Sequence, residues 1–149
     1  MYRKCSRCNK RYFKLEEDLR IRLLKSSNLW EIEERIKLYG GFIQKTEYSL
    51  IGGNRIDLLC FKTPELIIIE LKKYIAKPEA FGQILNYILI SREKHSSFGF
   101  SSVRGIILAH RISEKLKNLV SQYQNERIDL KEYYIDSRDR IRIGNSICI

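Results

Sequence analysis

The stretch over residues 54–73 constrains the fold most strongly, because its pattern predicts two β-strands joined by a tight turn at Thr63, Pro64 and Glu65. Its second half contains three consecutive isoleucines at 67–69, which make the strand apolar on both faces. Such a run is typical of a central strand that is buried on both sides. The sequence therefore predicts a hairpin at the centre of a covered sheet.

Three polar residues interrupt this hairpin: Asp57, Glu70 and Lys72. Glu70 and Lys72 are two apart, so they project from one face of a strand. A turn centred between Thr63 and Pro64 would pair residue 57 with residue 70, and a turn centred one residue later would pair it with residue 72. Opposed residues share a face, so either register brings Asp57 to Glu70 and Lys72. Lys72 could simply be the salt-bridge partner of Asp57, but one ion pair needs one carboxylate and here there are two.

Chain length, net charge and the length of apolar runs limit the class of protein. A chain of 149 residues suits one domain, and its net charge of +10 indicates a polyanionic partner, with nucleic acid ahead of an anionic membrane surface. The longest apolar runs are too short to span a bilayer, and the basic N-terminus has no apolar segment of the signal-peptide kind. We therefore expect a cytoplasmic protein with a nucleic acid as its partner and no membrane.

The basic charge is concentrated at the N-terminus. Residues 1–26 contain nine Lys or Arg and three acidic residues, which gives +6 of the total +10. The aromatic residues Tyr2, Tyr12 and Phe13 lie among them, which suits stacking on bases, although a solvated extension with a short helix over 15–24 fits equally well. We divide the chain into a basic N-terminal extension over residues 1–27 and a single domain over residues 28–149.

Cys5 and Cys8 form a C-x-x-C in this extension and could supply two of the four ligands of a zinc ion. The second pair is not evident, because Cys60 lies in the central strand, Cys148 is next to the last residue, and the two histidines are isolated. Intracellular cysteines are more often reduced or metal-bound than paired. One alternative is a zinc ion bound at Cys5 and Cys8, and another is a zinc ion shared by the C-x-x-C pairs of two chains in a dimer. The cysteines could also be free thiols or form a local disulfide.

Residues 28–39 are expected to form a helix that begins at the N-cap Asn28 and ends at two glycines. Glu33 lies inside the apolar stripe of this helix. A carboxylate directed at the core needs a cation or a metal, unless it sits at the edge of the stripe and reaches water.

The rest of the pattern predicts one α/β domain with a central mixed sheet flanked by helices. Strands are expected at 42–51, 103–109 and 128–135, with a weak edge strand after residue 140. Helices are expected at 78–92 and 113–124, a turn at 52–54 and a loop at 95–102. On the helix over 78–92, Gln83 and Tyr87 are four apart and share a face.

This constellation suits phosphodiester hydrolysis. Asp57 and Glu70 make a hard oxygen site for Mg²⁺ or Mn²⁺, to which Glu33 could add a ligand. Such a metal lowers the pKa of a bound water, neutralises charge on the phosphate and aligns the scissile group. Lys72 could position or deprotonate that water or stabilise the phosphorane, and Gln83 could orient it. The candidate DNA contacts are Arg55, Lys73, Lys77, Tyr87 and Arg11.

At this point the residues carry a family resemblance. The spacing of Asp57 and Glu70-Leu71-Lys72 resembles the D…(D/E)-x-K signature of the PD-(D/E)xK, or restriction-endonuclease-like, nucleases. Five segments in order resemble the catalytic domain of the NucS/EndoMS endonucleases of archaea and some bacteria. They are E-I-E-E-R-I-K-L (31–38), R-I-D-L-L (55–59), I-I-I-E-L-K-K (67–73), A-F-G-Q-I-L-N-Y-I (80–88) and V-R-G-I-I-L-A (103–109).

The resemblance implies a restriction-endonuclease-like fold that uses Mg²⁺ or Mn²⁺. It implies that Asp57 and Glu70 are metal ligands and Lys72 the catalytic lysine. Glu33 matches the acidic residue of the first helix, with Glu34 as a second choice, and Gln83 and Tyr87 match polar positions of the following helix. The family acts as a dimer on mismatched, branched or flap-like DNA. Residues 1–27 stand where the family has its N-terminal DNA-binding and dimerisation domain.

The sequence thus predicts a metal-dependent DNA endonuclease that acts on structured or mismatched DNA as a homodimer. One alternative is a Holliday-junction resolvase of the same superfamily, which would cut four-way junctions and ignore mismatched duplex. Another is a non-catalytic DNA-binding module with a nuclease-like fold. A third, a zinc-dependent adaptor, rests on Cys5 and Cys8 alone.

Overall fold

The computed structural model describes residues 1–39, 48–49, 55–93 and 99–148. They form a mixed β-sheet in the strand order β1-β2-β9-β8-β7-β6-β3, with β10 paired to β9 and a separate β4-β5 pair. In chain order the elements are β1 Tyr2–Lys4, β2 Arg11–Phe13, α1 Glu16–Arg22, α2 Ser26–Ile32, β3 Lys37–Leu38, β4 Tyr48–Ser49, β5 Arg55–Ile56, β6 Leu58–Lys62, β7 Glu65–Ala76, α3 Pro78–Arg92, β8 Ser102–Ile112, α4 Glu114–Gln122, β9 Ile128–Ile135 and β10 Ile141–Gly144.

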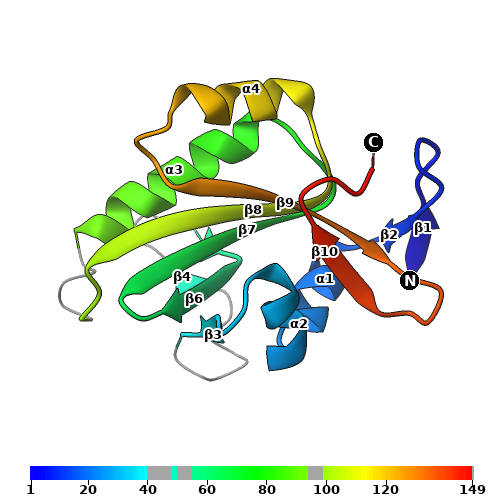
Figure 1. Ribbon diagram of the computed structural model, residues 1–149, viewed down its shortest axis with the longest axis horizontal. Coiled ribbons are helices and arrows are strands. Elements are labelled where there is room, and N and C mark those ends of the chain that lie inside the picture. Colours follow the sequence, from blue (N-terminus) through cyan, green and yellow to red (C-terminus); the bar gives the residue numbers. More distant parts are fainter. Residues whose placement is uncertain (40–47, 50–54, 94–98, 149) are drawn as a thin grey trace.

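The strand β7 is the centre of the sheet. It is antiparallel to β6 and parallel to β8, and β8 is parallel to β9. Parallel neighbours need a crossover connection, and α3 and α4 supply the two crossovers. Both helices lie on one side of the sheet, with α1 and α2 on the other (Figure 1). This mixed α/β arrangement places β7 between two layers of helices.

The side chains of β7 alternate between two cores. Ile67, Ile69 and Leu71 pack in the core on the side of α1 and α2, and Leu66 and Ile68 pack in the core on the side of α3 and α4. All five are at most 3% exposed. Full burial of such a side chain contributes about 1.5–3 kcal/mol. The strand is therefore buried on both faces, as its apolar run predicts.

The central hairpin has the first of the two predicted registers. Leu58 pairs with Ile69 and Lys62 with Glu65, so the turn is centred between Thr63 and Pro64. The helix α3 and the strand β9 have the predicted bounds. The weak strand expected after residue 140 is β10, and it pairs with β9. Ser113 caps α4 by accepting a hydrogen bond from the Leu116 N–H.

Part of the expected pattern cannot be compared with the structure. Of the strand expected at 42–51, only residues 48–49 are described, and they form β4. The turn at 52–54 and the first half of the loop at 95–102 lie outside the described residues. The strand expected at 103–109 is longer than predicted and runs from Ser102 to Ile112. Within the described part of the chain, no helix is long and apolar enough to cross a membrane.

Residues 1–27 do not form a separate extension. The strand β2 pairs with β9, so the β1–β2 hairpin continues the main sheet, and a boundary at residue 27 would fall inside α2. Phe13 and Leu19 are at most 1% exposed in the core. Tyr12 is 9% exposed and stacks on the ring of Tyr74. Tyr12 and Phe13 are therefore core residues, which excludes the base-stacking role that the sequence suggested for them.

Candidate active site

Asp57, Glu70 and Lys72 lie together at the open end of the central hairpin. The chain bends at Asp57 between β5 and β6, so the β6–β7 ladder ends at the Leu58–Ile69 pair. The Asp57 Oδ2 then accepts the Leu71 N–H at 2.8 Å. The Lys72 Nζ lies 3.7 Å from the Glu70 Oε1. Lys72 therefore pairs with Glu70, and Asp57 is held by the backbone of the same strand.

The Glu70 carboxyl group lacks a full set of partners. Its side chain is 6% exposed, and its buried Oε2 accepts no hydrogen bond from any described residue. Burial and then the Asp57 charge raise the pKa of Glu70 to about 8, although Lys72 opposes them. Burial also raises the pKa of Asp57, and the Leu71 N–H opposes that shift. Two buried carboxyl groups this close retain a proton at neutral pH unless a cation neutralises them.

A third carboxylate near this pair comes from α1. Besides burial and the mutual effect of the pair, the negative charge of Glu16 raises the pKa of both Asp57 and Glu70. Glu16 and Asp57 line one pocket of about 170 Å³, together with Glu17, Arg20 and Leu71. Glu16 is exposed and begins α1, so its carboxylate is accessible from solvent.

Glu16 could not be recognised as a site residue from the sequence. Acidic residues are common in the first turn of a helix, and Glu16 is one of three in a row. What brings it to the site is the packing of α1 on the sheet, through Leu19 and Leu23, both of which are fully buried. That contact is tertiary, and no local pattern reports it.

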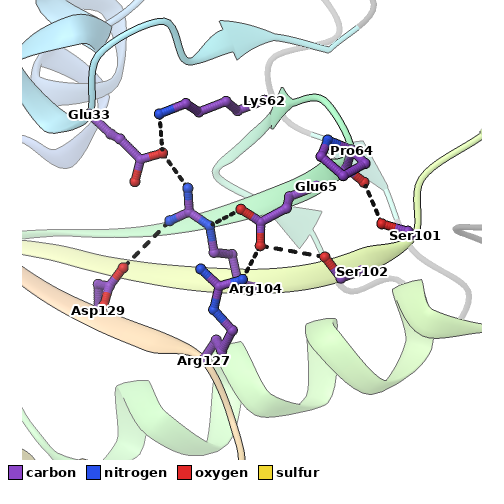
Figure 2. A network of polar contacts seen from close by, with 9 residues as sticks. All are labelled: Glu33, Lys62, Pro64, Glu65, Ser101, Ser102, Arg104, Arg127 and Asp129. Carbon is purple, nitrogen blue, oxygen red and sulfur yellow. Dashed lines mark hydrogen bonds and ion pairs between the residues drawn. The ribbon is translucent and has the colours of Figure 1, made fainter.

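The structure places Glu33 elsewhere. The helix α2 ends at Ile32, earlier than the predicted end at Tyr39, and Glu33 follows it with extended backbone. The Glu33 carboxylate binds the Arg104 guanidinium and lies 3.4 Å from the Lys62 Nζ (Figure 2). Lys62 stands at the turn end of the hairpin, which is about 15 Å of strand from its open end. The prediction that Glu33 joins Asp57 and Glu70 is therefore wrong.

The partner of Glu33 explains its position. Arg104 on β8 is 3% exposed and also binds Glu65 at 3.1 Å and Asp129 at 3.4 Å (Figure 2). A buried guanidinium needs several acceptors to offset the loss of its hydration. Glu33 is one of them, which makes it part of a structural ion-pair network.

The two predicted polar residues of α3 differ in their surroundings. Tyr87 is 8% exposed, and burial followed by the Glu70 and Asp57 charges raises its pKa, which places its hydroxyl near those carboxylates. Gln83 lies one turn earlier on α3 and is exposed. Tyr87 thus adjoins the site from the α3 side, and its burial leaves it little surface for contact with DNA.

The other candidate DNA contacts are spread over the molecule. Arg11 on β2 binds Asp139 at 2.8 Å, and the Lys73 Nζ donates to the Lys14 carbonyl at 2.9 Å. Lys77 is the exposed N-cap of α3. Arg55 lies on β5, and its side chain is outside the described part of the structure. Cys5 and Cys8 lie in the β1–β2 loop, where the Cys5 Sγ is 3.8 Å from the Tyr74 hydroxyl of β7.

The fold is similar to two solved structures. One is a complex of EndoMS with double-stranded DNA, which is 24% identical, covers 78% of this chain and 44% of that one, and has a TM-score of 0.61. The other is a repair endonuclease from Pyrococcus abyssi, at 22% identity, 81% and 47% coverage, and a TM-score of 0.63. This chain thus spans less than half the length of either protein. No family model and no curated protein matches the sequence.

Proposed function

We propose that this protein is a metal-dependent DNA endonuclease with a restriction-endonuclease-like fold and a PD-(D/E)xK site at Asp57, Glu70 and Lys72. The observation that carries the proposal is the buried Glu70 Oε2, which has no partner among the described residues and lies beside a second buried carboxyl group. The similarity of the fold to two repair endonucleases supports the choice of a nuclease.

The residues present fit a hard divalent cation. Asp57 and Glu70 offer oxygen ligands, and the orphaned oxygen of Glu70 is one that a cation would satisfy. When bound, Mg²⁺ or Mn²⁺ would supply a water of lowered pKa and neutralise charge on the phosphate. Glu16 is the third acidic residue of the site in this proposal, in the role that the sequence suggested for Glu33.

The remaining side chains act on the water and the phosphate. Lys72 lies beside Glu70, and in this proposal its Nζ holds the attacking water and the scissile phosphate in line. Tyr87 limits the access of bulk water from the α3 side. Gln83 lies one turn earlier and is exposed, and in this proposal it contacts the substrate.

DNA is the proposed partner on two grounds. The net charge of +10 favours a polyanion, and one of the similar structures is a complex with double-stranded DNA. We assign structured or mismatched DNA as the substrate class and a homodimer as the active form. Light scattering of the protein with and without DNA tests the homodimer.

The experiment that tests the proposal is cleavage of end-labelled mismatched, flapped, four-way and single-stranded DNA in Mg²⁺, in Mn²⁺ and in EDTA. We expect cleavage only with metal, and a loss of at least about 100-fold in Asp57→Asn, Glu70→Gln and Lys72→Met. Glu114→Gln is the matched control, because its side chain is 81% exposed on α4, and it should cleave like the wild type.

The DNA panel also separates the alternatives. Symmetric cleavage of the four-way junction alone would identify a junction resolvase. Binding of DNA without cleavage in either metal, and without Mn²⁺ binding that depends on Asp57 and Glu70, would identify a DNA-binding module. Cleavage that persists in all three site variants would refute the assignment of the site.

A further inference from the structure

Four metal-ligating side chains from distant parts of the chain converge on one point outside the proposed active site. Cys5 and Cys8 come from the β1–β2 loop, His110 from β8 and Cys148 from the C-terminal segment that follows β10. Their ligand atoms all lie within 4.8 Å of one another. Figure 1 shows the C-terminal end beside the β1–β2 loop. The fold thus supplies the second ligand pair that the sequence did not reveal.

The spacing of these atoms matches a tetrahedral zinc centre. Zinc bonds of about 2.3 Å to sulfur and about 2.0 Å to nitrogen place neighbouring ligands about 3.8 Å apart for two sulfurs and about 3.5 Å apart for sulfur and nitrogen. The Cys5 and Cys148 sulfurs are 3.6 Å apart, and the Cys8 Sγ lies 3.4 Å from the His110 Nε2. These two distances fit a tetrahedral zinc ion, and all four ligand atoms lie within 4.8 Å of one another.

The surroundings of His110 fix the tautomer and the ring orientation that a zinc ligand needs. Its Nδ1 lies 2.7 Å from the Tyr133 carbonyl oxygen, which can only accept, so Nδ1 carries the proton. The lone pair of the neutral ring is then on Nε2, which faces the thiols. His110 is fully buried, so this orientation is fixed. A second hydrogen bond of this kind is what metal-binding histidines use to set their tautomer.

The cysteines are also held in place by backbone contacts. The Cys5 N–H donates to Lys10 and the Asn9 N–H donates to Cys5, both at 2.8 Å, which closes the loop that presents the C-x-x-C. The buried Glu132 accepts the Ile147 N–H at 2.6 Å and fixes the segment that carries Cys148.

We propose that Cys5, Cys8, His110 and Cys148 bind one Zn²⁺ in a closed Cys₃His site with a structural role. Four protein ligands leave no position for a catalytic water. Thiolate ligands favour zinc over the hard cations proposed for Asp57 and Glu70, so the two sites select different metals. A centre with three thiolates and Zn²⁺ has a net charge of −1, which suits Arg7 and Arg111 in the pocket that Cys148 lines.

The site joins the two ends of the chain. Backbone pairing attaches β2 to β9 at a single residue pair, Arg11 with Ile135, so the N-terminal hairpin is weakly tied to the sheet by its ladder. A metal shared by the β1–β2 loop, β8 and the C-terminal segment adds a strong tie at the same place. Given the proposed nuclease function, the tie also sets α1 and Glu16, which follow β2, against the carboxyl pair.

The test is the metal content of the 149-residue protein purified under reducing conditions. We expect about one zinc per chain in the wild type, and less than about a tenth of that in Cys8→Ser and Cys148→Ser. Cys60→Ala is the matched control, because Cys60 is a buried cysteine outside the cluster, and it should keep its zinc. Glu70→Gln should keep it as well, so the result is independent of nuclease activity.

A second measurement uses only the wild-type protein, so it tests the proposal even if the ligand variants fail to fold. Wild-type protein produced in Co²⁺-supplemented medium should show the visible bands of tetrahedral Co²⁺ and thiolate charge-transfer bands in the near ultraviolet. Wild-type protein that contains neither zinc nor this spectrum would overturn the proposal, as would a disulfide between Cys5 and Cys148 in the purified protein. Zinc that remains at full occupancy in both Ser variants would also overturn it.

Discussion

The ionisation of Glu70 destabilises the folded protein. Its pKa is raised from 4.5 to about 8, first by burial and then by the Asp57 charge. Without metal, the folded protein therefore keeps a proton on Glu70 over a pH range in which the unfolded chain has lost it. The stability that this proton contributes is fully present below about pH 4.5 and is lost as the pH rises through about 8.

Replacement of Glu70 by Gln should remove this pH dependence. In EDTA at pH 8.5, Glu70→Gln should be more stable than the wild type by about 1–2 kcal/mol, or roughly 3–6 °C in melting temperature, because no charge is buried. At pH 5 the difference should nearly vanish. Thermal unfolding at both pH values measures it. Added Mn²⁺ at pH 8.5 should stabilise the wild type and leave the variant unchanged. A variant that melts below the wild type at pH 8.5 would contradict this account.

Lys72 should separate catalysis from metal binding. Lys72→Met should reduce single-turnover cleavage by at least about 100-fold, because the ammonium no longer holds the water and phosphate. It should still bind Mn²⁺, but at higher pH, since Lys72 lowers the pKa of Glu70. Calorimetric titration with Mn²⁺ at pH 7 and pH 9 checks this. Equal Mn²⁺ affinity of variant and wild type at pH 7 would show that the Lys72–Glu70 pair is electrostatically unimportant.

At the scale of elements, α3 packs closely against β8 at Gly105. A Cβ added there would lie 2.6 Å from the Ile84 Cδ1 and 3.0 Å from its Cγ1. Ile84 is fully buried, so Gly105→Ala should destabilise the protein by about 1–3 kcal/mol. Gly82→Ala is the opposing control: a Cβ there meets nothing within 4 Å, and the helix should gain about 0.5–1 kcal/mol. Urea unfolding of both variants measures the two effects, and effects of the same sign would contradict this packing.

In our proposal, Glu16 at the start of α1 has the role that the sequence suggested for Glu33, which follows α2. Glu16→Gln should slow cleavage by at least about tenfold and change stability by less than about 0.5 kcal/mol, because Glu16 is exposed beside the pocket. Glu33→Gln should do the opposite. It leaves the buried Arg104 short of a charged acceptor, which costs about 1–3 kcal/mol, and cleavage should stay within about threefold. Parallel unfolding and cleavage assays decide which residue serves the site.

The elements that could be predicted are those with a local pattern. The hairpin, α3, the cap of α4 and β9 follow from apolar periodicity and from Pro78 and Ser113. The packing of the N-terminal region could not be predicted, because aromatic residues among basic ones, such as Tyr12 and Phe13, have the same sequence pattern whether they stack on bases or fill a core. Within the site, strand parity predicts that Asp57 and Glu70 lie together. The position of Glu16 depends on how α1 packs on the sheet, and the position of Glu33 depends on its ion pair with Arg104, and neither contact has a local sequence pattern.

At the scale of the whole molecule, the cluster of ligands near the two termini could not be predicted from the sequence either. Cys5 and Cys148 are 143 residues apart and Cys8 and His110 are 102 apart, so no spacing rule joins them. The parallel order β7-β8-β9 and the antiparallel β2 and β10 beside β9 bring them together. The proposed zinc centre is thus a property of the sheet topology, as the carboxyl pair is a property of a single hairpin.

The charge of the whole molecule predicts how the proposed binding of DNA should depend on salt. With a net charge of +10, much of the affinity should come from released counterions, so binding should weaken steeply with salt. For about four phosphate contacts, the affinity should fall by roughly 100-fold between 50 and 200 mM salt. Fluorescence anisotropy of Asp57→Asn with a labelled duplex in EDTA measures the slope without cleavage.

Substitution of single lysines then locates the contact surface. Lys77→Ala should reduce the slope of log affinity against log salt by about 1, because Lys77 is exposed at the start of α3, directly after the strand that carries Glu70 and Lys72. Lys115→Ala is the matched control, an exposed lysine on α4, and should leave the slope unchanged. If Lys115 rather than Lys77 changes the slope, the duplex lies along α4 and not along the start of α3, where Lys77 stands.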